Sequence, residues 1–200
     1  MESTVSFRDF EERDIDFIYK CKNDEKLNSM IVGDWHPFTY EEAVKWVHGC
    51  MGEHDTYKFW AVCTNDEERR IVGWVSMSNI DKKEKTARFH GIVIADPLYR
   101  DGLAEIECYL FIYKKAFLEF GLEKVIGSSI TKNGDSQIMK KAFYCTTDNI
   151  SENSINRDGV WYNVSTGHLS KEAFISHYKN GDYEIMPLIK RIKKLKKMYA

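Results

Sequence analysis

The sequence lacks an excess of either charge and any long apolar run. Its 29 Lys and Arg residues nearly balance 31 Asp and Glu residues, so the net charge is −2. This balance excludes a nucleic-acid-binding protein that relies on bulk positive charge. No apolar stretch is long enough to span a bilayer, and no signal-peptide pattern is present. We therefore expect neither a nucleic-acid partner nor a membrane span.

Closely spaced cysteine pairs are also missing. The five cysteines are odd in number, widely spaced and without a CxxC pair: Cys21, Cys50, Cys63, Cys108 and Cys145. This pattern favours free thiols in a reducing cytoplasm over disulfides or a zinc site. We predict a cytoplasmic protein without a metal site. At 200 residues and 43% hydrophobic content the chain can bury a proper core, and its length favours a single domain.

The most informative stretch runs from Ala87 to Val125. It begins with a β-branched apolar run over 89–94, which predicts a buried strand. A turn over 96–104 contains Pro and Gly, and apolar residues then recur at helical spacing until Gly121, a typical helix C-cap. A strand, a glycine loop and a helix N-terminus together can bind an anion such as a phosphate. On its own, a glycine after a strand is more often only a turn.

Before this stretch the pattern predicts a strand, two helices and a hairpin. The strand covers 4–10, and the first helix has an apolar stripe of Ile15, Ile18, Tyr19 and Leu27. Thr39 and Glu42 form a capping box for the second helix. The hairpin strands are expected over 59–63 and 71–77, and an irregular segment over 30–38 contains Trp35 and His36.

After this stretch the pattern predicts a short helix over 137–143 and a hairpin within 153–169 with Asp158-Gly159 at its tip. The last segment, 187–200, is a basic amphipathic helix. Such a helix either touches a membrane or an acidic partner, or packs on its own domain or a second subunit; the short length and lack of Trp or Phe anchors favour packing. We place the domain at 1–178 and this tail at 179–200.

The order of these segments resembles the GNAT superfamily of N-acetyltransferases, from about Val5 to Glu172. The family's loop reads Gln/Arg-x-x-Gly-x-Gly/Ala, and Gly102-x-Ala104 matches its second half. Tyr99 stands where Gln or Arg is expected, so either the loop is one residue shorter or Arg100 serves from a shifted position. Asn133-x-x-Ser136 resembles the family's second CoA segment.

The resemblance implies an α/β (α+β) fold with one mixed, mostly antiparallel sheet that is splayed at the CoA site and flanked by helices. It implies that acetyl-CoA is the cofactor and that a primary amine attacks it directly in a ternary complex. The expected cofactor-binding residues are Ile92, Val93, Ile94, Arg100, Asp101, Gly102, Leu103, Ala104, Asn133, Ser136 and Lys140. A monomer or a homodimer is compatible with this family.

The proton-transfer residues depart from the family pattern. Where many relatives carry a strand Glu, this chain has Arg88, which cannot act as a base. His90, two residues on, is the candidate base because its unperturbed pKa lies near ~6.5; a sheet-bonding role is the alternative. Lys140 stands where relatives have the Tyr that protonates the leaving thiolate, and Tyr144 is the nearest substitute. For the acceptor amine we expect Trp35, His36 and Arg88, although Trp35 packing the loop onto the core is the alternative.

The chain's ending resembles the branch of ribosomal-protein N-terminal, spermidine and amino-sugar-nucleotide acetyltransferases. The acceptor is accordingly a small-molecule or peptide amine: an amino-sugar nucleotide, a protein N-terminus or a polyamine. The missing Glu and Tyr keep a second function class open. This is a non-catalytic module that retains the fold and binds acyl-CoA or a partner.

Overall fold

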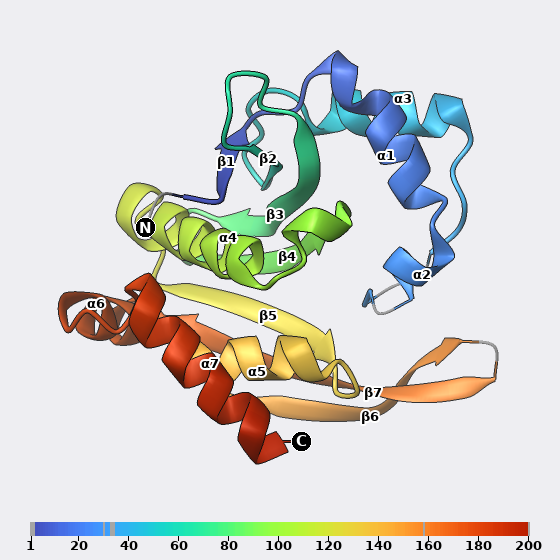
Figure 1. Ribbon diagram of the computed structural model, residues 1–200. Coiled ribbons are helices and arrows are strands. Elements are labelled where there is room, and N and C mark those ends of the chain that lie inside the picture. The colour runs from blue at the N-terminus through green and yellow to red at the C-terminus, as the bar shows by residue number, and fades with distance from the viewer. Residues whose placement is uncertain (1–2, 30, 33–34, 158, 200) are drawn as a thin grey trace. The chain divides into compact units, whose positions relative to one another are not determined.

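The computed structural model describes residues 3–29, 31–32, 35–157 and 159–199 (Figure 1). Two compact units divide the chain. Unit 1 comprises Met1–Ile80 and His90–Ile112, and unit 2 comprises Asp81–Phe89 and Tyr113–Ala200. The division falls inside strand β4 (Thr86–Ile94) and near the end of helix α4 (Leu103–Lys114).

Seven strands form one sheet in the order β1-β2-β3-β4-β5-β7-β6. The pair β4–β5 is parallel, whereas β1–β2, β2–β3, β5–β7 and β6–β7 are antiparallel. The predicted fold class, an α/β protein with a mixed, mostly antiparallel sheet flanked by helices, is confirmed.

The strands of unit 1 are β1 (Val5–Arg8), β2 (Tyr57–Thr64), β3 (Ile71–Asp81) and the second half of β4. The predicted hairpin is confirmed as β2 and β3, in which Trp60 opposes Val75. Gly73 on β3 is required by close packing, because a Cβ at this position would lie 2.0 Å from the carbonyl oxygen of Val93 on β4. Any side chain here would push the two strands apart.

The helices of unit 1 are η1 (Glu12–Asp14), α1 (Ile15–Lys22), α2 (Glu25–Asn28), α3 (Tyr40–Cys50), η2 (Pro97–Tyr99) and α4. Helices α1 and α3 pack side by side (Figure 1). The predicted capping box is confirmed: Glu42 N donates to Thr39 Oγ1 at 3.2 Å, and Thr39 N donates to the Glu42 carboxylate at 2.7 Å. Tyr19 was wrongly assigned to the buried stripe. It is exposed and packs edge-to-face on Tyr40 at 5.5 Å.

Unit 2 contains η3 (Lys115–Glu119), β5 (Lys124–Ile130), α5 (Gly134–Ala142), β6 (Asn149–Arg157), β7 (Val160–Ser170), α6 (Lys171–Lys179) and α7 (Ile185–Tyr199). Gly121 follows the helix with a φ of +65°, as predicted for a C-cap. The predicted hairpin is confirmed as β6 and β7; of its tip, Asp158 lies outside the described residues, and Gly159 has a φ of +81°.

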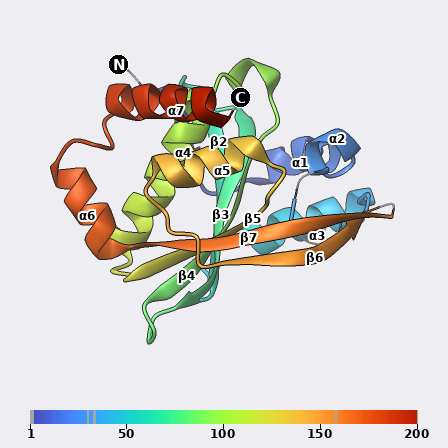
Figure 2. The same cartoon turned by 90° about the horizontal axis from the view of Figure 1, so that it is seen from below.

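The predicted C-terminal helix is α7, which begins two residues earlier than expected and packs on α5 (Figure 2). Leu188 is fully buried, and Arg191 donates to the carbonyl of Ala142 at 2.6 Å. Met198, near the end of α7, is exposed. The boundary at 178/179 stays a prediction. In the described part of the chain, no helix combines the length and hydropathy needed to cross a membrane.

Candidate functional site

The predicted cofactor strand is the second half of β4. The parallel ladder between β4 and β5 joins Thr86–Phe89 to Lys124–Gly127 and does not include His90–Ile94. Gly91 has a φ of +147°, which side-chain-bearing residues rarely adopt. At the strand end, Ala95 N donates to Val72 O at 2.8 Å. In unit 1 the strand therefore stays joined to β3, and its β5-side main chain lies outside that ladder.

The loop after β4 is held by its own side chains. Arg100 donates from Nε to Ile94 O at 2.8 Å and from a terminal nitrogen to Ala95 O at 2.7 Å, so it fastens the loop to the strand end. Gly102 has a φ of +93°, and a Cβ there would meet nothing within 4 Å. Helix α4 begins at the next residue, Leu103, whose N–H donates to Asp101 Oδ1 at 2.9 Å. The loop leaves open space at the helix N-terminus.

A second carboxylate of this loop, Asp96, is neutralised within unit 1. Burial opposes its charged form, but hydrogen bonds from Arg70 (2.9 Å) and from Leu98 N (3.0 Å) outweigh this effect and lower the pKa of Asp96. Arg70 therefore offsets part of the loop's negative charge, which would otherwise oppose the binding of a phosphate.

His90, the candidate base, has an oriented ring. Its Nδ1 lies 3.4 Å from Ser78 Oγ, and its ring packs edge-to-face on Phe59 at 6.2 Å. The side chain is exposed. This geometry is compatible with proton transfer at the exposed ring.

The expected acceptor residues Trp35 and His36 have different surroundings. Trp35 Nε1 donates to Lys22 O at 2.9 Å, which ties this segment to the end of α1, as the packing alternative expects. His36 is exposed, with Nε2 3.7 Å from the Glu42 carboxylate. Residues 30, 33 and 34 of the same segment lie outside the described residues.

Sequence reasoning missed a lysine beside these residues. The Lys22 ammonium lies over the rings of Trp46 (4.6 Å), Phe38 (5.3 Å) and Trp74 (5.3 Å). Burial lowers the pKa of Lys22. No local sequence pattern indicates this cluster, because Lys22 and its three aromatic neighbours lie far apart in the sequence.

Three predicted residues of the second CoA segment lie in unit 2. Asn133 caps α5 by accepting from Ser136 N at 3.1 Å. Lys140 donates to Ser165 O on β7 at 2.9 Å, and burial lowers its pKa. Its Cε would be 3.9 Å from a Cβ at Gly127, so Lys140 covers the face of β5 that carries Gly127.

Tyr144, the candidate acid, follows α5 with a φ of +59°. Its ring stacks on His177 at 3.5 Å, and the Arg191 guanidinium lies 4.3 Å from the ring centroid. These contacts hold the ring against α6 and α7. A catalytic role for its hydroxyl stays a prediction.

In unit 2, Arg88 and Lys140 lie on opposite faces of the sheet. It donates to Ser128 Oγ at 2.9 Å, and Ser128 Oγ lies 2.9 Å from Thr166 Oγ1. Ser128 and Gly127 are neighbours on a strand and point to opposite faces. The structure therefore places Arg88 and Lys140 apart, and it adds the hydroxyls of Ser128 and Thr166, which the sequence did not single out. Within the described residues, no three His, Cys, Asp or Glu side chains gather to hold a metal ion.

Comparison with known proteins places these elements in a family. The model of the acetyltransferase (GNAT) domain matches residues 4–142, well over half of the chain. No curated protein matches the sequence.

Solved structures share the fold at low sequence identity. A spermidine N-acetyltransferase from Vibrio cholerae, in complex with CoA and spermine, has a TM-score of 0.76 at 15% identity, covering 87% of this chain and 99% of that one. A GNAT-family acetyltransferase from Bacillus anthracis has a TM-score of 0.70 at 20% identity, with coverages of 86% and 98%. A GCN5-related N-acetyltransferase from Brucella melitensis has a TM-score of 0.72 at 15% identity, with coverages of 92% and 82%.

Proposed function

The chain belongs to the GNAT family of N-acetyltransferases, which use acetyl-CoA, and from this premise we propose that a primary amine attacks the thioester directly in a ternary complex. The observation that carries this proposal is the arrangement of β4, the open Gly102 position and the start of α4 within the matched residues. The Vibrio cholerae structure, which holds CoA and spermine, supports an amine as acceptor.

The reaction places three demands on the protein. The thioester carbonyl must be held next to the amine, which supplies much of the rate enhancement. The amine must lose a proton to a base. Negative charge on the carbonyl oxygen must be stabilised, for which a main-chain N–H is sufficient.

We assign the first and third demands to main-chain groups. The β5-side backbone of Ile92, Val93 and Ile94 is proposed to pair with the pantetheine arm and to donate to the carbonyl oxygen. Gly102, Leu103 and Ala104 are proposed to receive the pyrophosphate at the α4 N-terminus, because the helix dipole favours negative charge there. Asp101 accepts from Leu103 N, so it must release this N–H if a phosphate is to take it. Asn133, Ser136 and Lys140 are proposed as further cofactor contacts in unit 2.

The second demand is assigned to His90. Its ring is oriented by Ser78 and exposed, and Arg88 on the same strand has N–H donors but no acceptor and cannot serve as a base. Tyr144 is the candidate for protonating the leaving thiolate. We retain Trp35 and His36 as candidate acceptor contacts.

Cofactor binding at the loop is tested by Gly102→Glu, with Gly102→Ala as the matched control. Both variants place a side chain at a φ of +93° and share its strain, but only Glu adds bulk and negative charge where the phosphate is proposed. At ~100 times its dissociation constant, acetyl-CoA should stabilise the wild type by about 2.7 kcal/mol. We expect calorimetric titration to show weak binding by Gly102→Glu and near-normal binding by Gly102→Ala.

Equal affinity of Gly102→Glu and the wild type for acetyl-CoA would refute the loop assignment. Thiol release with a panel of amines completes the test. If acetyl-CoA binds and no amine releases thiol, the chain is a non-catalytic acyl-CoA-binding module instead.

A further inference from the structure

Arg88 is an exposed cation whose hydrogen-bond partner is a hydroxyl and not a carboxylate. Its guanidinium donates to Ser128 Oγ at 2.9 Å, and that oxygen lies 2.9 Å from Thr166 Oγ1. No ion pair joins Arg88 to an acid within the described residues. A guanidinium fixed by a neutral partner keeps its full charge and further N–H donors for an external acceptor.

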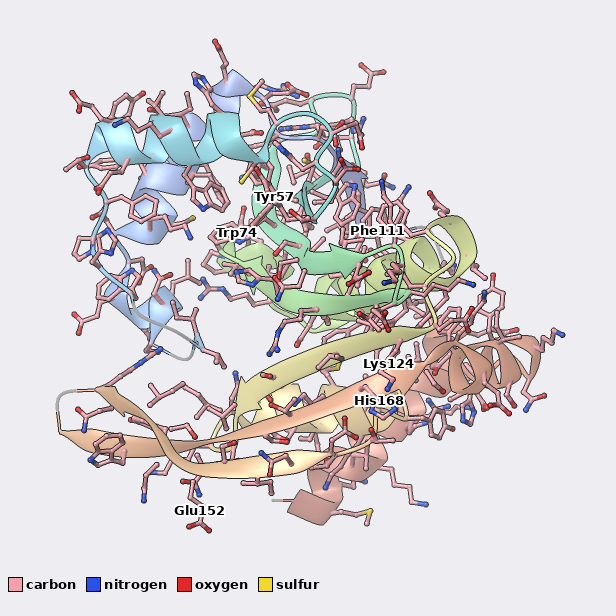
Figure 3. The ribbon with its side chains drawn as sticks, turned by 180° about the vertical axis from the view of Figure 1, so that it is seen from behind. Tyr57, Trp74, Phe111, Lys124, Glu152 and His168 are labelled. Carbon is pink, nitrogen blue, oxygen red and sulfur yellow. The ribbon has the colours of Figure 1, made fainter. Side chains whose placement is uncertain are left out.

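These three side chains lie on one face of the unit 2 sheet. Arg88 opposes Ile126, Ile126 opposes His168, and Ser128 opposes Thr166. Residues two apart on a strand share a face, so this face also carries Lys124 and His168. The other face packs on α5, where Gln137 donates to Ser129 Oγ at 2.9 Å. Figure 3 views the face with Arg88, on which Lys124 and His168 are labelled, and α5 and α7 lie behind the strands.

The acid next to this face is already compensated. The Asp148 carboxylate lies 2.7 Å from His168 Nδ1 and accepts a hydrogen bond from Thr146 Oγ1 at 2.8 Å. The hydrogen bond from His168, then that from Thr146, and the charge of Lys124 lower the pKa of Asp148. Of the two strand cations, Lys124 thus acts on Asp148, whereas no acid among the described residues forms an ion pair with Arg88.

We propose that Arg88, positioned by Ser128 and Thr166, binds an anionic group of the acceptor, so that the preferred substrate is an amine that carries a phosphate or carboxylate and not a polyamine. This proposal rests on the proposed acetyl transfer. A guanidinium binds either anion through paired N–H donors, and it repels a second ammonium group. The chain shares its fold with a spermidine N-acetyltransferase, but we expect it to prefer a different acceptor.

Matched amines that differ only in an anionic group test this preference. The pairs are glucosamine with glucosamine 6-phosphate, and alanyl-alaninamide with alanyl-alanine; spermidine is the polycation. We expect kcat/KM of the wild type to favour one anionic member by about tenfold or more, the value of a charge-assisted hydrogen bond. The pair that responds distinguishes phosphate from carboxylate.

Arg88→Gln removes the charge and can still donate to Ser128, so the two members of each pair should then react with about equal kcat/KM. Lys141→Gln removes a charge from exposed Lys141 on α5 and should leave the preference intact. Equal rates for both members of each wild-type pair, a preference that survives Arg88→Gln, or spermidine as the best acceptor would overturn the proposal.

A second measurement does not depend on turnover. Inorganic phosphate is titrated into ¹⁵N-labelled protein, and the Arg88 Nε–H signal is assigned from its loss in Arg88→Lys. We expect phosphate to shift this signal, and less so in Ser128→Ala. An unshifted signal counts against the Arg88 site even if acetyl-CoA binds, whereas a shifted signal without acetyl-CoA binding leaves the site standing and removes the proposed transfer.

Discussion

At the scale of single residues, β4 carries both the proposed base and the proposed anion-binding side chain. Arg88 and His90 occupy alternate positions on one strand, one a guanidinium with N–H donors only and one an imidazole that can both donate and accept. Residue type and position alone single out both as candidates, and their roles stay predictions. Their partners, Ser128 for Arg88 and Ser78 for His90, come from 40 and 12 residues away, and pairing of that kind cannot be deduced from local pattern.

His90→Ala should lower kcat by about 10²-fold or more, the usual contribution of a general base, and leave the dissociation constant of acetyl-CoA nearly unchanged. The reason is that the ring is proposed to take the amine proton but not to hold the cofactor. Stopped-flow thiol release and calorimetry separate the two effects.

Tyr144→Phe keeps the stacking on His177 and removes only the hydroxyl, so it tests the proposed general acid. Unchanged kcat in either variant removes that residue from proton transfer.

At the scale of elements, local signals predicted most of the fold. The capping box at Thr39, the C-cap at Gly121 and the turn at Gly159 each specify backbone geometry within four residues, so they could be found in the sequence. Tyr19 shows where periodicity fails. It has helical spacing with the buried stripe, but α1 is short and its neighbour Tyr40 lies at the surface as well. The buried face of α1 is therefore narrower at Tyr19 than the helical spacing predicts.

A glycine-to-alanine substitution should lower the unfolding free energy in strand β3 and raise it in helix α3. Gly73→Ala would place a Cβ 2.0 Å from Val93 O and 3.0 Å from Ile94 Cα, both main-chain atoms, so we expect a loss of about 1–3 kcal/mol in unfolding free energy. Gly49→Ala in helix α3 meets nothing within 4 Å and should gain about 0.5–1 kcal/mol from helix propensity.

Urea titration followed by circular dichroism gives both values. Because Val93 and Ile94 belong to the proposed cofactor strand, Gly73→Ala should also weaken acetyl-CoA binding, whereas Gly49→Ala should not. A Gly73→Ala protein as stable as the wild type would show that β3 and β4 do not approach as closely as described.

At the scale of the whole molecule, all five thiols are free, and they are distributed over both units. Three of them, Cys21, Cys50 and Cys63, share one hydrophobic cluster of unit 1 with Ile18 and Trp74. Burial raises the pKa of Cys21 and Cys50 to about 12 and that of Cys63 to about 11. Since the thiolate is the reactive form, these groups are protected twice, by lack of access and by protonation.

Ellman's reagent at pH 8 should therefore modify at most one thiol of the native protein promptly and all five in guanidinium chloride. The prompt one is expected to be Cys145, which is partly exposed and lies 3.3 Å from the Tyr113 hydroxyl, although burial raises its pKa to about 11 as well. Cys145→Ser should abolish the prompt reaction and leave four thiols.

In urea, the three clustered thiols should become reactive together, at the unfolding midpoint seen by circular dichroism, because exposing one of them opens their shared core. Prompt reaction of two or more native thiols would contradict this packing. Protection of the protein's own thiols also allows CoA released by acetyl transfer to be measured with the same reagent.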